Sequence, residues 1–146
     1  MLAPDGEILS VRRRYRTGTL ILETEYDTRT GTILVTDAMP IRTEGPDVVR
    51  IVSCARGHVN MRMELVIRFD YGDLLPWIRP LEGGMLAIAG PKVLCLRTSV
   101  PLSGDKRPVG LPQLAGAIEA ATSPSSRWTT LRRLSIIYVN QLLSGN

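Results

Sequence analysis

The stretch RFDYGDLLPW, residues 68–77, holds the densest group of side chains in this sequence that could perform chemistry. Asp70 and Asp73 could supply the protonated and the ionised carboxyl group that hydrolysis of a glycosidic bond requires. Tyr71 and Trp77 could form an aromatic platform on which a sugar ring stacks. The stretch is therefore a candidate catalytic or sugar-binding site, with a core strand that runs into a turn as the alternative.

Turn chemistry accounts for most residues of this stretch. Gly72 tolerates a positive φ angle, and Asp70 or Asp73 can cap exposed backbone amides. The spacing of the two aspartates does not itself indicate catalysis, so we predict no catalytic residue. This interpretation leaves Trp77 unexplained. With Tyr71 it stays a candidate for carbohydrate binding or for contact with another domain, and a buried core tryptophan is the further alternative.

Side chains that could hold a metal ion are few and scattered. Cys54 and Cys95 lack a CxxC spacing and His58 is the only histidine, so we predict no metal site and no cofactor. The two thiols are interpreted as small buried hydrophobes. His58 lies in ARGHVN, which we interpret as a turn between two strands. Asp37, in VTDAMP, is expected to cap the backbone at a strand end.

Length and composition indicate one globular domain. The chain has 146 residues, of which 44% are hydrophobic, and this suits a single substantial core. No apolar run reaches the roughly 18 residues that span a bilayer. The opening MLAPDGEILS carries acids where a secretory signal needs a basic start and an apolar stretch. We therefore predict a cytoplasmic protein without membrane contact.

The charge distribution disfavours nucleic-acid binding. The net charge is +4, and after Gly104 five basic residues stand against two acidic ones. Before that point acids and bases are interleaved, and RRRYR at residues 12–16 is the only dense basic run. Only 5% of the residues are aromatic, whereas a nucleic-acid interface needs a continuous basic face with stacking aromatics. We predict no nucleic-acid partner.

Apolar residues at every second position are the strongest structural signal. In MRMELVIRF, residues 61–69, the opposite face is charged except at Val66, which is typical of a half-buried strand. The face expected to point inward carries Met61, Met63, Leu65, Ile67 and Phe69.

Further strands follow the same logic before residue 104. Residues 19–27 and 31–40 flank the turn-forming DTRTG and are predicted to form a hairpin. The segments around Gly83, Gly84 and AGPK are interpreted as hairpin turns. Six short strands joined by turns too short for helical crossovers predict an antiparallel β-sandwich. The remaining predicted strands are residues 47–57, 85–90 and 92–100.

The character of the sequence changes after residue 104. In LPQLAGAIEAATSPSSRWTTLRRLSIIYVNQLLSGN the apolar residues fall at helical intervals. We predict two helices separated by TSPSS, the first of them short, with Ser126 as the N-cap of the second. The chain is accordingly divided into a β domain, residues 1–104, and a helical tail, residues 105–146. The tail is expected to fold separately and more weakly.

Three stretches of the β domain resemble a known family: RRRYRTGTLILETEYDTRTGTILVTDAMP, VVRIVSCARGHVNMRMELVIRFDYGDLLPWIR and AGPKVLCLRTSVPL. They closely resemble the N-terminal domain of bacterial glycoside hydrolase family 15 proteins, the glucoamylase and trehalase-like enzymes. The resemblance covers residues 8–104 in order. It implies a β-sandwich in front of an (α/α)6 barrel that hydrolyses α-glucosidic bonds with two glutamates.

The chain differs from that family in three ways. The family's usual opening strand pair is absent, the barrel with both catalytic glutamates is missing, and the tail from Lys106 has no counterpart. We therefore expect a truncated, non-catalytic module whose partner is the barrel. A free-standing protein that binds an α-glucoside through Tyr71 and Trp77 is the alternative. A sandwich short of its first and last strands is also expected to self-associate through exposed sheet edges.

Overall fold

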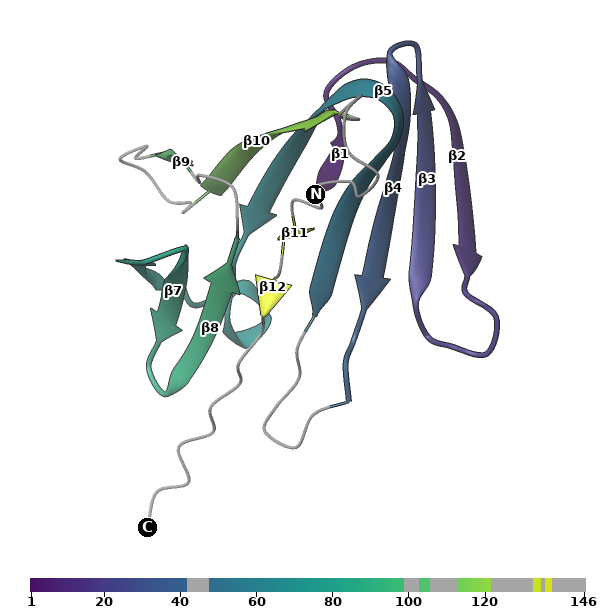
Figure 1. Ribbon diagram of the computed structural model, residues 1–146. Helices are drawn as coiled ribbons and strands as arrows, with labels where there is room; N and C mark the ends of the chain where they lie inside the picture. The colour runs from purple at the N-terminus through teal and green to yellow at the C-terminus, as the bar shows by residue number, and fades with distance from the viewer. Residues whose placement is uncertain (42–47, 99–102, 106–112, 122–132, 135, 138–146) are drawn as a thin grey trace.

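The structure, a computed structural model, describes residues 1–41 and 48–98 in full and the backbone of residues 103–105, 113–121, 133–134 and 136–137. Within these ranges the chain is mainly β, with antiparallel strands in two sheets (Figure 1). This confirms the prediction of a mainly β, antiparallel fold. Over the same ranges the chain forms no helix long and apolar enough to cross a membrane.

The larger sheet has the order β2-β3-β4-β5-β10-β9, and β1 and β11 also pair with β5. The predicted hairpin of residues 19–27 and 31–40 is confirmed, because β3 and β4 pair with Leu22 opposite Asp37 and Asp27 opposite Thr32. The strands of this sheet are β1 (Leu2–Pro4), β2 (Ile8–Tyr15), β3 (Leu22–Thr28), β4 (Gly31–Ala38), β5 (Val49–Val66), β9 (Ser103–Asp105), β10 (Gln113–Ala121) and β11 (Arg133–Leu134).

The smaller sheet has the order β12-β8-β7-β6. Its two hairpins turn at Gly83, with φ +68°, and at Gly90, with φ +59°, which confirms both predicted turns. Its strands are β6 (Trp77–Leu81), β7 (Gly84–Ala89), β8 (Lys92–Arg97) and β12 (Ile136–Ile137).

The long strand β5 corrects one prediction. Residues 47–57 and 61–69 were expected to be two strands with a turn at ARGHVN, yet β5 is continuous over 18 residues. Its first half pairs with β4, and its second half pairs with β1 and β10. In Figure 1 β5 runs up beside β4, curves over and comes back down, so the predicted turn is a sharp bend within one strand, where Gly57 adopts φ +72° and the β4 register shifts by a bulge between Thr32 and Ile33. His58 therefore lies within a strand.

The tail also differs from its prediction where the structure describes it. Gln113–Ala121, the place of the first expected helix, forms β10 and pairs antiparallel with the second half of β5. The free edge of β5 offers backbone hydrogen bonds that the local sequence pattern does not reveal. The second expected helix, after Ser126, lies mostly outside the described residues, where only β11 and β12 are placed. The division at residue 104 stays a prediction.

The hydrophobic core is formed mainly by three parts of the chain. These are β4 with the first half of β5, the second half of β5, and the smaller sheet. Met61, Met63 and Ile67 are buried as predicted, and Leu65 and Phe69 are partly buried against the same cluster. Burial of such side chains contributes about 1.5–3 kcal/mol each. The other buried members include Ile33, Val35, Val52, Met85, Ala87, Leu94 and Leu96.

We expect Ile67→Asp to abolish cooperative folding, at a cost of at least about 4 kcal/mol, because it buries an unpaired carboxylate. Arg62→Ser should change stability little, since Arg62 is exposed on β5. Urea unfolding followed by circular dichroism measures both changes. Equal tolerance of the two substitutions would contradict the assigned inward face.

Candidate functional site

The stretch that raised the question of catalysis is a tight turn. Phe69 and Leu74 form an isolated β-bridge around the short 3-10 turn η1 (Asp70–Gly72). The Leu74 N–H donates to the Phe69 carbonyl, and the Asp73 N–H donates to the Asp70 carbonyl, each at 3.1 Å. The predicted turn is thus confirmed. The Asp70 carboxylate, however, forms an ion pair with Lys92 at the start of β8, which ties the turn to the smaller sheet.

The turn holds its central residues in a costly backbone conformation. Asp70 has φ +48° and Tyr71 has φ +56°, which places two successive non-glycine residues in the left-handed region. Each such residue costs about 1–2 kcal/mol. Tyr71 is fully exposed, so packing of its ring does not offset this cost. Strain of this kind is typical of functional surfaces and switch regions.

Trp77 is also exposed, with 84% of its surface accessible. The alternative of a buried core tryptophan is therefore wrong. Trp77 begins β6 and lies opposite Ile88 of β7. The next residue, Ile78, packs against the core, so alternation directs Trp77 to the opposite side of the sheet.

The side of the smaller sheet that carries Trp77 is apolar, and we call it the β6–β8 outer face. Antiparallel sheets with one buried face usually present polar residues on the other. Here the inner face is buried, while the apolar residues beside Trp77 on the outer face are half-buried. Register places these residues on the outer face: Trp77, Arg79 and Leu81 of β6, Leu86 and Ile88 of β7, and Val93, Cys95 and Arg97 of β8.

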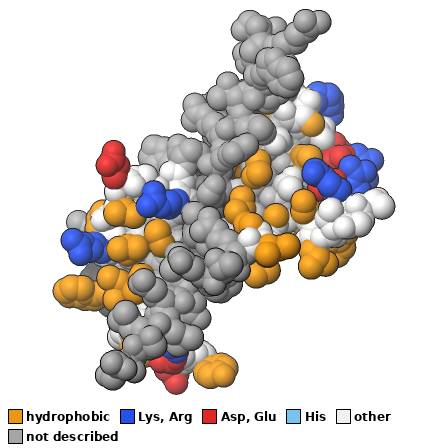
Figure 2. Space-filling model, turned by 60° about the horizontal axis from the view of Figure 1, so that its bottom comes forward, with side chains coloured by type: hydrophobic (Ala, Val, Ile, Leu, Met, Phe, Trp, Pro, Cys, Tyr) orange, Lys and Arg blue, Asp and Glu red, His pale blue; other side chains and the backbone are white. Residues whose placement is uncertain are grey.

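Figure 2, which shows one side of the molecule, has hydrophobic side chains gathered over the smaller sheet with basic side chains among them. Arg79 and Arg97 are the exposed basic residues that alternate with the outer face's apolar members. An exposed apolar surface rimmed by polar residues marks a place of contact with another molecule or domain.

The sequence carries a signal for the β6–β8 outer face that is distinct from alternation. MLAIA and VLCL are apolar at every position, and continuous apolar strands are typical of sheets buried on both faces. Leu86, Ile88, Val93 and Cys95 could have been found in this way.

The basic run at residues 12–16 is built into an ionic ladder on β2 and β3. Arg12 lies opposite Glu25 and forms an ion pair with it. Glu23 accepts hydrogen bonds from Arg14, with 3.0 Å between Nε and Oε2, and from Arg16, with 2.7 Å between Nη2 and Oε1. Hydrogen bonds from Arg16 and then Arg14 hold the pKa of Glu23 below its ordinary value.

Asp27 and Arg12 also belong to this ladder. The hydroxyls of Thr32 and then Ser10 donate to Asp27, at 2.8 and 2.9 Å, and lower its pKa. The hydrogen bond and charge of Glu25 raise the pKa of Arg12. These acids are held ionised by their partners, which suits a structural role and opposes a proton-donating one.

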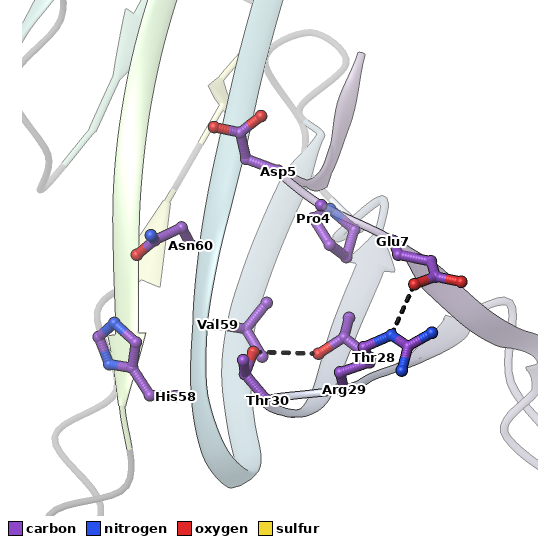
Figure 3. Close-up of a pocket in the computed structure, with 10 residues that line it drawn as sticks. Pro4, Asp5, Glu7, Thr28, Arg29, Thr30, His58, Val59 and Asn60 are labelled. Atoms are coloured by element: carbon purple, nitrogen blue, oxygen red, sulfur yellow. Dashed lines mark hydrogen bonds and ion pairs between the residues drawn. The ribbon is translucent and has the colours of Figure 1, made fainter.

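A cavity of about 270 Å³ lies between the β1–β2 connection, the β3–β4 turn and the bend of β5 (Figure 3). Arg29 Nε donates to Glu7 Oε2 at 2.6 Å on one side of it. Asp5, His58 and Asn60 also line it, and in Figure 3 the Asp5 carboxylate lies at the opposite end of the group from the His58 ring. The cavity does not present the converging acid and base that catalysis requires.

The remaining candidates from the sequence are Asp37 and the two cysteines, and their contacts indicate structural roles. Asp37 lies within β4 and pairs with Arg50, whose Nη2 is 3.0 Å from Oδ2, so its predicted backbone-capping role is replaced by an ion pair. Cys54 is buried, with its Sγ donating to the carbonyl oxygens of Arg56 and Gly57 at 3.4 Å, and Cys95 is half-buried. Across the part of the chain that the structure describes, no three His, Cys, Asp or Glu side chains are grouped as metal ligands would be.

No family model, curated protein or solved structure matches this chain. The exposed aromatics and the β6–β8 outer face are therefore assigned from geometry alone.

We expect acid to weaken the fold through Glu23. Because the folded-state pKa of Glu23 is lowered, its stabilisation is present above its ordinary value of 4.5 and is lost as pH falls through the lowered pKa. Glu23→Gln should lower the urea midpoint at pH 7, and its difference from the parent protein should shrink as the pH falls below 4.5 and through the lowered pKa. Glu82→Gln, at an exposed turn, serves as the control and should leave the pH profile unchanged. Parallel profiles for all three proteins would contradict the role of Glu23.

The strained turn gives a second expectation. Tyr71→Gly should raise the free energy of unfolding by about 1 kcal/mol, because glycine adopts positive φ without a steric cost and the exposed ring loses no packing. Tyr71→Ala keeps the Cβ atom and should change stability by less than about 0.5 kcal/mol. Thermal or urea unfolding compares the two. Identical effects would show that the turn is not strained.

Proposed function

We propose that this chain is a non-catalytic β-sandwich module that packs against and supports a separate catalytic domain. The resemblance of residues 8–104 to family 15 hydrolases makes that domain an (α/α)6 barrel acting on α-glucosides in the cytoplasm. The single observation that carries the proposal is the β6–β8 outer face, where a sheet already packed on one side presents Trp77, Leu86 and Ile88 on the other.

The composition of the outer face suits a protein contact. Burying apolar surface contributes about 25 cal/mol per Å², so a second domain laid on these strands would be held chiefly by the hydrophobic effect. Trp, Tyr and Arg are the residues that most often dominate binding energy at interfaces. Trp77 lies beside Arg79 in register with Ile88 and Leu86, which supplies an aromatic anchor with a basic rim.

The turn at Tyr71 adds a preorganised element. Its backbone hydrogen bonds and the ion pair between Asp70 and Lys92 fix the turn before any partner arrives. A group held in place in the free protein loses less conformational entropy on binding than a mobile one. The strain stored at Tyr71 is then the cost of presenting its ring.

The acids of the described strands support a non-catalytic role. A retaining or inverting glycosidase needs one carboxyl group with a raised pKa beside a second, ionised carboxylate. Glu23 and Asp27 have lowered pKa values instead. Asp37 and Asp70 are engaged by Arg50 and Lys92.

A second candidate function is carbohydrate binding, which the exposure of both Tyr71 and Trp77 favours. Accessible aromatic faces can stack on the apolar side of a pyranose ring. The two candidates share Trp77 but differ in the partner that occupies it.

Mixing the 146-residue chain with a family 15 barrel produced without its own β domain tests the proposal. We expect a complex by isothermal titration calorimetry, and Trp77→Ser should weaken it at least tenfold by removing the anchor. Leu20→Ser is the matched control, because Leu20 is as exposed as Trp77 but lies between β2 and β3. It should bind within twofold of the parent chain.

Trehalose and maltose titrations separate the two candidates. A fluorescence change on adding sugar that disappears in Trp77→Ser, together with no binding of the barrel, would replace the docking proposal with carbohydrate binding. Loss of barrel binding in both variants, or in neither, would overturn the assignment to the β6–β8 outer face.

A further inference from the structure

Strand β2 leaves one long edge of the larger sheet open. It is the terminal strand in the sheet order, and among the described strands β3 alone pairs with it (Figure 1). All eight of its residues are exposed, including the apolar Leu9, Val11 and Tyr15. An exposed edge of this length offers unpaired backbone groups to which another strand can add.

The charges on β2 restrict which strand could add. On one face Arg12 and Arg14, and beyond the strand end Arg16, form a column two residues apart, and their side chains remain 71%, 76% and 56% exposed. The acids of β3 contact this column from one side only. Each guanidinium has five N–H donors, so each keeps donors for a second carboxylate.

The opposite face of β2 carries Val11, Arg13 and Tyr15, by alternation with the arginine column. A complementary strand therefore needs carboxylates at alternate positions on one face and apolar or hydroxyl side chains on the other. β3 itself, LETEYDT, has this pattern and already pairs with the inner edge of β2. A second strand of this kind would place acids on both sides of the arginine column.

We propose that the free edge of β2 binds an extended acidic segment of a partner protein, in which Glu or Asp alternates with apolar residues, by antiparallel strand addition. The proposal does not rest on docking at the β6–β8 outer face. It assigns a role to the basic run at residues 12–16 that the ionic ladder only partly explains.

A second copy of the chain fits this edge less well. β2 contains three arginines and no acid, so two β2 strands side by side would place positive charge against positive charge. Like charges on neighbouring strands are destabilising, whereas opposite charges contribute about 0.2–1 kcal/mol per pair. Charge complementarity therefore selects an acidic strand.

A fluorescein-labelled heptapeptide with Glu at its second, fourth and sixth positions and Val or Thr between them is the probe. We expect the 146-residue chain to bind it in an anisotropy titration and to bind the same peptide with Lys for Glu at least tenfold more weakly. Raising the salt concentration from 50 to 500 mM should weaken binding of the Glu peptide, since screening acts on exposed charges. Amide NMR shifts should move in residues 8–15.

Arg12→Gln with Arg14→Gln should reduce affinity for the Glu peptide at least tenfold. Arg62→Gln with Arg68→Gln removes two exposed arginines that lie in β5 and just after it, away from this edge, and should stay within twofold. If the first variant does not fold, a Glu peptide N-methylated at alternate residues replaces it, because it keeps the charge but loses strand pairing. Equal binding of the Glu and Lys peptides, or undiminished binding of the N-methylated peptide, overturns the proposal. So does a chain dimer in sedimentation that the Glu peptide fails to dissociate.

Discussion

The close approach of Gly57 to the β3–β4 turn is the contact on which the rest of the fold depends. A Cβ atom at this position would overlap the carbonyl oxygen of Thr30 and come within 3.0 Å of the Gly31 Cα atom. With φ +72°, Gly57 lets β5 leave the edge of β4 and continue as one strand. Only because of this bend can Met61 and Met63 join the core cluster that holds Ile33 and Val35 in the first half of the sheet.

The same bend determines which face of the smaller sheet is buried. The second half of β5 supplies the core residues against which Met85, Ala87 and Leu96 pack, so the inner face of β6–β8 is satisfied within this chain. That packing does not bury its outer face, where the apolar side chains of Leu86 and Ile88 are only half-buried. An apolar face left uncovered by its own chain is typical of a surface that contacts another domain or molecule.

Local patterns in the sequence were sufficient wherever the deciding contacts are local. The alternation of residues 61–69 predicted the buried face, and Gly83 and Gly90 marked their turns, because side-chain period and positive φ are properties of neighbouring residues. The continuity of β5 and the pairing of Gln113–Ala121 with it could not be predicted in this way. Both depend on an edge that exists only after distant strands assemble. Trp77 was ambiguous for a related reason, since a large aromatic suits a core and a contact surface equally.

The β6–β8 outer face and the free edge of β2 differ in how selectively each can bind a partner. The β6–β8 outer face is attractive to any apolar surface, so it carries little discrimination beyond shape and the charges of Arg79 and Arg97. The edge of β2 is attractive to any backbone, yet its arginine column repels basic strands and other copies of itself. A surface of the first kind suits a permanent contact, as within one protein or an obligate complex. One of the second kind can remain exposed and still select a partner by charge, because the column is neutralised on one side by Glu23 and Glu25 and is open on the other.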